Sequence, residues 1–178
     1  TMRRLLSLLV LLSPTSALAQ PPQAKGELPK VYLLGDSIRM GYAPLVAKKL
    51  EGVAEVVSPK DNGADTANTL RMLDKWLEAG KPVDVHINCG LHDLKFGKKT
   101  QKHQVPLEEY EKNLRAIIGK LHERTPHVLF ATTTPNFDDR HALRKADFDR
   151  FDKDVVAFDE RAMTIMRELD VPVDDLYR

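Results

Sequence analysis

Ser37 is the residue of this sequence best placed to act as a nucleophile. It follows an apolar run and a glycine in VYLLGDSIRMGY, the stretch formed by residues 31–42. A serine hydroxyl can attack an ester carbonyl when a neighbouring base takes its proton. The same position also suits a helix N-cap, because Asp and Ser side chains accept hydrogen bonds from the first N–H groups of a helix. On this stretch alone, both interpretations of Asp36 and Ser37 stay open.

Three further polar segments follow apolar runs in the same way. They are DNGAD at residues 61–65, NCGLHD at 88–93 and TTTPN at 132–136. Any one of these segments is a weak signal, because polar residues at strand ends commonly satisfy loop backbone. With the stretch that contains Ser37, four polar segments follow four separate apolar runs. They form one site if the fold brings the ends of these runs together.

Short apolar runs alternate with amphipathic stretches along the chain. Runs rich in Val, Ile, Leu or Thr predict strands at residues 30–34, 54–58, 83–88 and 128–132, with a fifth starting at Val171. Apolar spacing of three and four residues predicts helices at residues 43–50, 66–78, 107–124 and 147–169. This alternation predicts one α/β domain with a central parallel sheet covered on both faces. The carboxyl ends of parallel strands share one edge, so the four polar segments are expected to meet there.

Together the four segments resemble the sequence blocks of the SGNH (GDSL-type) hydrolases. LLGDSIRMGY is similar to the nucleophile block of that family, and DNGADTANTL to its glycine block. HINCGLHDLK occupies the place of the Gly-x-Asn-Asp block, and LFATTTPNF is similar to the strand-end element that follows. The resemblance covers residues 30–177 and implies a flavodoxin-like three-layer α/β/α sandwich.

The resemblance implies that Ser37 is the nucleophile and that its backbone N–H helps to hold the oxyanion. It implies a second backbone donor at Gly63, where a side chain would block the substrate oxygen. The third donor departs from the family pattern, because His92 stands where the family has Asn. A neutral imidazole can donate one N–H, provided that another group fixes its tautomer. Asp93 is the candidate for that group or for bracing the loop.

Two more residues are expected to support the site. Asn88, at the end of the same strand, is an alternative oxyanion donor, and Asp36 precedes the nucleophile. No metal site and no cofactor is expected. A flavin or nucleotide binder would need a glycine-rich phosphate loop after the first strand, and residues 35–41 have too few glycines at the wrong spacing.

The catalytic base is the second departure from the family pattern. The resemblance implies an Asp-x-x-His element after the last strand, but Arg178 stands in the last place of Asp175-Leu176-Tyr177-Arg178, and arginine is no base near neutral pH. The other histidines have no expected partner in a catalytic arrangement. We therefore expect a domain that is incomplete at its C-terminus, lacks its last helix and is inactive alone. A non-catalytic glycan- or acyl-binding pseudoenzyme on the same fold is the alternative.

The N-terminal residues follow the grammar of a secretory signal peptide. Arg3 and Arg4 precede an apolar run, and Ala17-Leu18-Ala19 is a small-x-small cleavage pattern. We expect a signal peptide at residues 2–19, a linker at 20–29 and the SGNH-like domain at 30–178. The apolar run is too short for a stable membrane anchor. These features predict a secreted or periplasmic protein.

The composition of the chain argues against some classes of binding partner. Without Arg3 and Arg4, the 27 basic residues fall to 25 against 26 acidic ones, so a nucleic-acid partner is not expected. The lone Cys89 predicts a buried thiol. The charge-rich segments 98–103 and 138–154 are expected to be solvated surface near the rim of the crevice. The resulting hypothesis is a secreted serine esterase that acts on a small-molecule or carbohydrate ester, with acetyl esters first; the sequence leaves the oligomeric state open.

Overall fold

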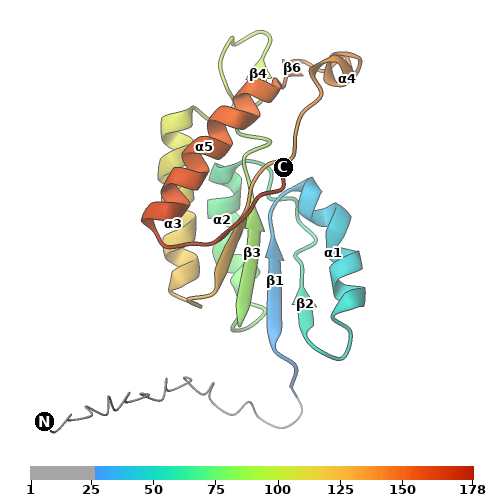
Figure 1. The fold of residues 1–178 in the computed structure, drawn as a ribbon, viewed down its shortest axis with the longest axis vertical. Helices are drawn as coiled ribbons and strands as arrows, with labels where there is room; N and C mark the ends of the chain where they lie inside the picture. Colours follow the sequence, from blue (N-terminus) through green and yellow to red (C-terminus); the bar gives the residue numbers. More distant parts are fainter. Residues whose placement is uncertain (1–26) are drawn as a thin grey trace, which may run out of the picture.

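The computed structural model describes residues 27–178 and contains one central parallel sheet (Figure 1). The signal-peptide prediction for residues 2–19 lies outside the described residues. The strands are β1 (Lys30–Leu34), β2 (Glu55–Val57), β3 (Asp84–Asn88), β5 (Val128–Ala131) and β7 (Val173–Asp174). They pair in the order β2-β1-β3-β5-β7, every pair parallel. This order confirms the predicted flavodoxin-like α/β fold.

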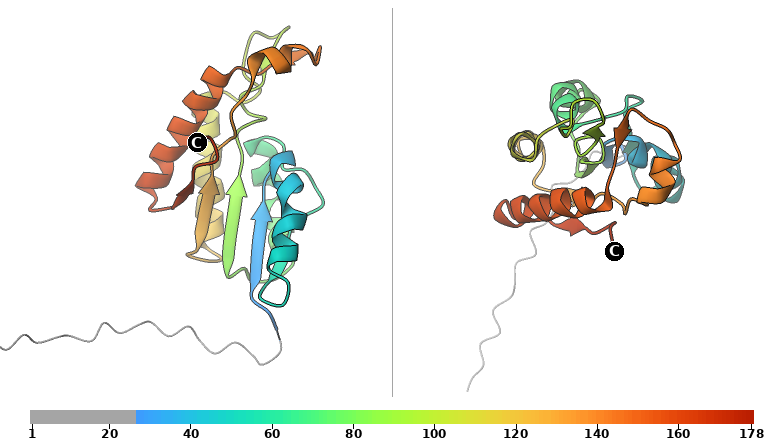
Figure 2. Two further views of the ribbon diagram at one scale, coloured as in Figure 1. Left: turned by 45° about the vertical axis from the view of Figure 1, so that its right-hand side comes forward. Right: turned by 90° about the horizontal axis from the view of Figure 1, so that it is seen from above.

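Four long helices connect the strands. They are α1 (Ser37–Lys49), α2 (Thr66–Leu77), α3 (Leu107–His122) and α5 (Asp152–Glu168). In both Figure 1 and Figure 2, α1 lies beside β2, whereas α3 and α5 lie toward the other end of the strand order. A short helix, α4 (Asp138–Ala142), and a two-stranded antiparallel pair, β4 (Phe96–Gly97) with β6 (Phe148–Asp149), project beyond the carboxyl ends of the strands.

One hydrophobic core joins one face of the sheet to α2, α3 and α5. Alternate strand residues supply the sheet side of this core, and each is at most 2% exposed: Tyr32, Leu34, Val85, Ile87, Val128 and Phe130. Helix residues such as Leu73, Ile118 and Phe158 complete it. Because successive side chains of a strand point to opposite faces, the intervening residues face the side on which α1 packs.

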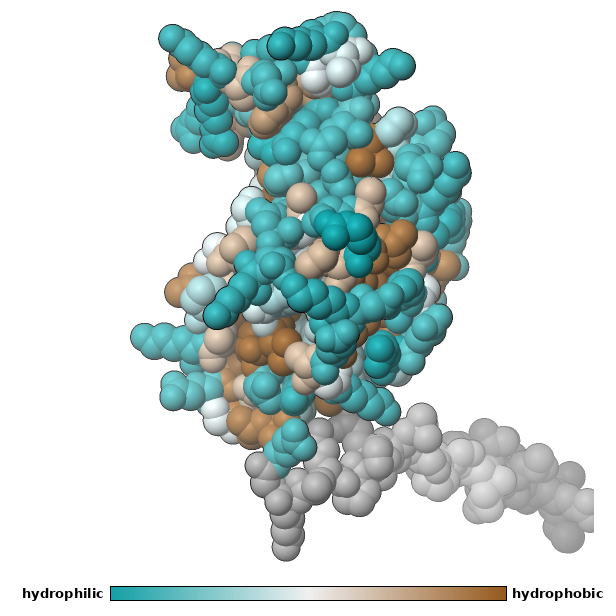
Figure 3. Space-filling view, turned by 180° about the vertical axis from the view of Figure 1, so that it is seen from behind, coloured by the Kyte–Doolittle hydropathy of each residue, from teal (hydrophilic) through white to brown (hydrophobic). Residues whose placement is uncertain are grey.

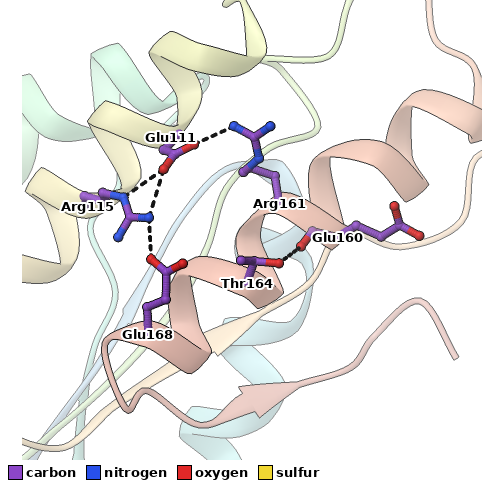
Figure 4. A network of polar contacts seen from close by, with 6 residues as sticks. All are labelled: Glu111, Arg115, Glu160, Arg161, Thr164 and Glu168. Atoms are coloured by element: carbon purple, nitrogen blue, oxygen red, sulfur yellow. Dashed lines mark hydrogen bonds and ion pairs between the residues drawn. The ribbon is translucent and has the colours of Figure 1, made fainter.

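An ion-pair network links the outer surfaces of α3 and α5 (Figure 4). Glu111 accepts from Arg115 at 2.8 Å within α3 and also pairs with Arg161 of α5. Arg115 then reaches Glu168 near the end of α5. Such partly exposed pairs contribute little individually, but the network fixes how the two helices lie against each other.

The face opposite the core is only partly covered, as expected for a domain without its last helix. Among residues 27–178, α1 contacts β1, β2 and β3. A groove of about 510 Å³ lies along β1, β3 and β5, and its lining includes Val31, His86 and Leu129. The back of the molecule is mainly hydrophilic, with apolar patches in its lower half (Figure 3). No helix within the described part of the chain is long and apolar enough to cross a membrane.

Two helices begin several residues away from their predicted starts. Helix α1 begins at Ser37 rather than residue 43, because Asp36 caps it there. Helix α5 begins at Asp152 rather than residue 147, because Phe148 and Asp149 are paired with β4. The segment 138–154 was predicted to be solvated surface, yet His141 within it is only 6% exposed.

Candidate active site

The turn after β1 places Ser37 at the start of a helix, exposed to solvent. Asp36, not Ser37, is the N-cap of α1: its Oδ1 accepts from the Ile38 N–H at 2.8 Å. Ser37 is the first residue of the helix, and its own N–H has no acceptor among the described residues, as expected for the first turn of a helix. The helix cap and the candidate nucleophile are therefore adjacent residues with separate roles.

Asn88, at the end of β3, stabilises this turn through its side-chain amide. Its Nδ2 donates to Asp36 Oδ1 at 3.3 Å, and the side chain is 1% exposed. Gly35 makes this approach possible: a Cβ at Gly35, whose φ is 137°, would lie 2.3 Å from Asn88 Oδ1. The Asn88 amide is thus engaged with Asp36, inside the protein, rather than facing a substrate.

Arg39 holds the loop after β2 against the same turn, and the sequence analysis did not identify it. Its guanidinium donates to four acceptors from two segments: Gly35 O at 3.0 Å in the turn after β1, and Ser58 Oγ at 2.9 Å, Pro59 O at 2.6 Å and Asp61 O at 2.7 Å in the loop after β2. The side chain is 1% exposed, and burial lowers the pKa of its guanidinium. Arg39 thus orders the loop that leads to Gly63.

Gly63 packs directly on the nucleophile turn. Its N–H donates to Gly35 O at 3.0 Å, so use of this N–H toward an oxyanion would require that bond to break. A Cβ at Gly63 would lie 2.7 Å from Gly35 O, which explains the glycine by close packing. Ala64 follows in a left-handed conformation with φ 52°, and its N–H donates to Asn62 Oδ1 at 2.8 Å, an exposed side chain that can rotate away.

His92 is held as a neutral donor by Lys95. The Lys95 ammonium lies 3.0 Å from His92 Nδ1, and an ammonium can only donate, so the ring proton of a neutral His92 belongs on Nε2. Burial, followed by the charge of Lys95, lowers the pKa of His92. His92 therefore presents an Nε2–H donor near neutral pH. Lys95, three residues along the chain, fixes the tautomer of His92, a role that the sequence-based hypothesis gave to Asp93.

Asp93 braces the loop instead, which was the other role predicted for it. Both its oxygens accept from the Thr66 N–H at the start of α2, and the Thr66 hydroxyl also donates to it. Asn113 of α3 donates in turn to the Thr66 hydroxyl at 3.2 Å. Burial raises the pKa of the Asp93 carboxyl to about 7. Asp93 thus ties the loop after β3 to α2 and α3.

A second buried carboxyl orders the loop after β5. Asp159 of α5 accepts from the Thr133 N–H at 2.9 Å, and burial raises its pKa to about 7. Gly90 packs against the same loop, where a Cβ would lie 2.9 Å from Thr133 Oγ1. The ends of β3 and β5 are therefore locked together at the crevice.

Within residues 27–178, no hydrogen bond joins a histidine to Ser37. His86 is engaged at both nitrogens, with Tyr42 at 3.0 Å and Asp174 at 3.3 Å. His103 pairs with Asp154, and His141 reaches the Phe148 carbonyl. His127 precedes β5 and His122 ends α3, both at the opposite edge of the sheet. His92 carries its proton on Nε2 and is a donor.

Among residues 27–178, no group of three His, Cys, Asp or Glu side chains could hold a metal ion. Cys89 is buried as predicted, and burial raises the pKa of its thiol well above the usual value. At the end of the chain, Arg178 pairs with Asp175 at 3.2 Å. The arrangement thus offers a hydroxyl at a helix start and nearby N–H donors, the parts needed to hold an acyl group and its oxyanion.

Comparison with known proteins agrees with this geometry. No family model matches the chain. It is 28% identical over 129 residues to a GDSL esterase/lipase of Arabidopsis thaliana, which covers 65% of this chain and 54% of that protein. It is 31% identical over 103 residues to the isoamyl acetate-hydrolyzing esterase 1 homolog of Mus musculus, covering 52% of this chain and 41% of that protein. The chain thus spans about half the length of these curated relatives.

Solved structures show the same fold. A lipase/acylhydrolase from Enterococcus faecalis has a TM-score of 0.68 at 22% identity, covering 84% of this chain and 77% of that one. The acetyl xylan esterase AlAXEase has a TM-score of 0.66 at 18% identity, covering 83% and 77%. The resemblance to the SGNH (GDSL-type) hydrolases, first seen in four sequence blocks, is confirmed in sequence and in fold.

Proposed function

We propose that this chain carries the nucleophile and the oxyanion donors of a serine carboxylic ester hydrolase of the SGNH type. The observation that carries the proposal is Ser37 exposed at the first position of α1, on the same sheet edge as the neutral donor His92. The curated relatives with which it shares sequence are named as esterases.

In the proposed reaction, Ser37 Oγ attacks the carbonyl carbon and loses its proton to a base. The alcohol leaves with a proton, and water then hydrolyses the acyl-enzyme. The carbonyl oxygen, negative in the transition state, is held by the Ser37 N–H and His92 Nε2–H. We assign the third donor to the Ala64 N–H in preference to Gly63, because the acceptor of Ala64 is a solvent-exposed side chain. Each such donor is worth roughly 3 kcal/mol.

The proposal requires a base other than the histidines already described. A serine without its base is a poor nucleophile, so we expect residues 1–178 alone to hydrolyse esters far more slowly than the protein made from the full reading frame of the parent gene. Ser37-dependent hydrolysis by residues 1–178 at the rate of the protein made from the full reading frame would contradict this expectation.

Ser37→Ala in the protein made from the full reading frame is the direct test. We expect turnover of p-nitrophenyl acetate to fall at least a thousandfold, since the acyl-enzyme can no longer form. Thr164→Ala is the matched control, because Thr164 is an exposed hydroxyl on α5 that donates to the Glu160 carbonyl (Figure 4). Equal turnover in Ser37→Ala and the unaltered protein would refute the esterase proposal.

The substrate and the location of the protein belong to the same proposal. The fold is shared with an acetyl xylan esterase, which supports acetylated carbohydrate as the first substrate to try. The leader at residues 2–19 supports export to the periplasm or the medium. N-terminal sequencing of the protein recovered outside the cytoplasm tests export: the expected mature protein starts at Gln20.

A non-catalytic glycan- or acyl-binding protein is the second candidate. The observation that favours it is that each histidine of residues 27–178 is engaged elsewhere or lies away from Ser37. If the full-length protein binds acetylated sugar but releases no acetate, and Ser37→Ala binds equally well, the binding function replaces the esterase.

A further inference from the structure

A pocket of about 250 Å³ opens beside the candidate active site, and its charged lining is entirely basic. Its lining comes from Leu91, in the loop after β3, and from residues between 134 and 150, which follow β5 and include α4. Arg140, Arg144 and Arg150 line it together with Thr134, and no carboxylate is among its lining residues. Three guanidinium groups around so small a volume create a strongly positive site.

Arg150 is the best-anchored of the three. Its Nε donates to the Leu91 carbonyl at 3.0 Å, and its guanidinium lies 5.1 Å from the centre of the Phe148 ring. Burial lowers the pKa of this guanidinium. Within residues 27–178, its terminal amino groups have neither an ion-pair partner nor a hydrogen-bond acceptor. A partly buried cation in this state gains most from an anion, which a planar guanidinium can bind through two parallel hydrogen bonds.

Arg140 and Arg144 also lack ion-pair partners within the described part of the chain. Arg140 stacks on Phe137 at 4.8 Å, which leaves its N–H groups open to the pocket. Two nearby carboxylates have other partners: Asp138 accepts from the Asn136 side chain at 2.9 Å, and Asp149 pairs with Lys98 at 3.3 Å. By contrast, the arginines that link α3 and α5 are all ion-paired (Figure 4).

The pocket adjoins the crevice of Ser37 through a shared loop. Leu91, whose carbonyl accepts from Arg150, lies directly before His92 in the loop after β3. A substrate whose ester carbonyl lies at Ser37 can therefore place a neighbouring group in this pocket. The volume is below the 300–1,000 Å³ typical of a drug-sized ligand, so a small group fits it better than a second sugar ring.

We propose that this pocket is an anion subsite and that the preferred ester carries a carboxylate close to the scissile bond. The inference deepens the proposed function and rests on it for the position of the ester. The carboxylate belongs either to the acyl group, as in a succinyl ester, or to the alcohol, as in an acetylated uronic acid. In both cases, Arg150 binds it through its free amino groups while Arg140 and Arg144 neutralise the remaining charge.

Kinetics on the protein made from the full reading frame test the subsite. One arm compares mono-p-nitrophenyl succinate with p-nitrophenyl acetate, and the other compares acetylated methyl glucuronide with acetylated methyl glucoside. We expect at least a tenfold higher kcat/KM for the anionic substrate of one pair. A preference in the succinate pair places the carboxylate on the acyl group, and a preference in the glucuronide pair places it on the alcohol. In Arg140→Gln/Arg144→Gln, and in Arg150→Gln, this ratio of anionic to neutral kcat/KM is expected to fall at least tenfold.

Arg167→Gln is the matched control, because Arg167 is exposed on α5, away from the pocket; its ratio should equal that of the unaltered protein. Binding of succinate and of methyl glucuronide to Ser37→Ala, followed by NMR, gives a readout without hydrolysis. Ester hydrolysis with no anionic preference and no anion binding overturns the subsite while the esterase stands. Anion binding that is lost in Arg140→Gln/Arg144→Gln, without any hydrolysis, supports the subsite and refutes the esterase.

Discussion

Removal of the Arg39 guanidinium should destabilise the protein more than loss of any exposed charge. In Arg39→Met the apolar stem is retained, but four hydrogen bonds from a buried cation are lost. At roughly 1 kcal/mol net for each bond, the loss is about 4 kcal/mol. Relief from burying the guanidinium offsets part of this loss, so we expect the free energy of unfolding to fall by about 3 kcal/mol.

Urea unfolding followed by circular dichroism measures this change. Arg39→Lys keeps the charge and up to three donors, and we expect an intermediate loss of about 1–2 kcal/mol. Arg167→Met is the control, since an exposed arginine without a described ion pair should change stability by about 0.5 kcal/mol or less. A loss below about 1 kcal/mol in Arg39→Met would show that the loop after β2 is held by other contacts, and would refute the reasoning.

Three further predictions concern the same edge of the sheet. The folded-state pKa of Asp159 is raised to about 7, so the stability that its protonated form contributes is complete below about pH 4 and is lost as pH rises through 7. In Asp159→Asn, the fall in the free energy of unfolding between pH 5 and pH 8 should therefore be smaller by about 2 kcal/mol. Urea titrations that show an unchanged fall would contradict this. Gly63→Ala should cost about 1–3 kcal/mol by overpacking, whereas Gly41→Ala, which meets open space in α1, should be neutral or stabilising; equal effects on thermal unfolding would refute this. Lys95→Met should raise the pKa of His92 in an NMR titration, because the lowering charge is removed, and an unaltered pKa would disprove the contact.

The sequence predicted the sheet well, because each buried strand is a short apolar run ended by turn residues. The four longest strands lie within two residues of their predicted bounds. The start of α1 was missed because its apolar pattern is weak: Arg39 is buried in this helix while Met40 and Leu45 are exposed. A charged residue inside and apolar residues outside invert the periodicity on which helix prediction depends.

The site was predicted in its residue types but not in its contacts. Ser37 and His92 follow strands, so their place at one edge followed from topology. The partner of His92 depends on how the loop folds, and proximity in sequence did not distinguish Lys95 from Asp93. The basic pocket was missed because Arg150 stands in a segment of mixed charge, where only the fold separates its guanidinium from the carboxylates.

Because β7 pairs with the sheet over a short length, this edge has a lower local stability than the centre of the sheet. Only Val173 and Asp174 pair with β5, so side chains hold the strand as much as the backbone ladder does. Tyr177 donates to Asp152 Oδ2 at 2.6 Å, and Asp152 Oδ1 accepts from the Asn136 N–H at 2.9 Å.

Local unfolding is therefore expected to begin at β7 and to extend through Asp152 to the wall of the basic pocket. Amide hydrogen exchange would report both regions as one opening unit, faster than the strands at the centre of the sheet. A ligand that fills the basic pocket would then slow exchange at β7 as well, because it binds only the closed form of that unit.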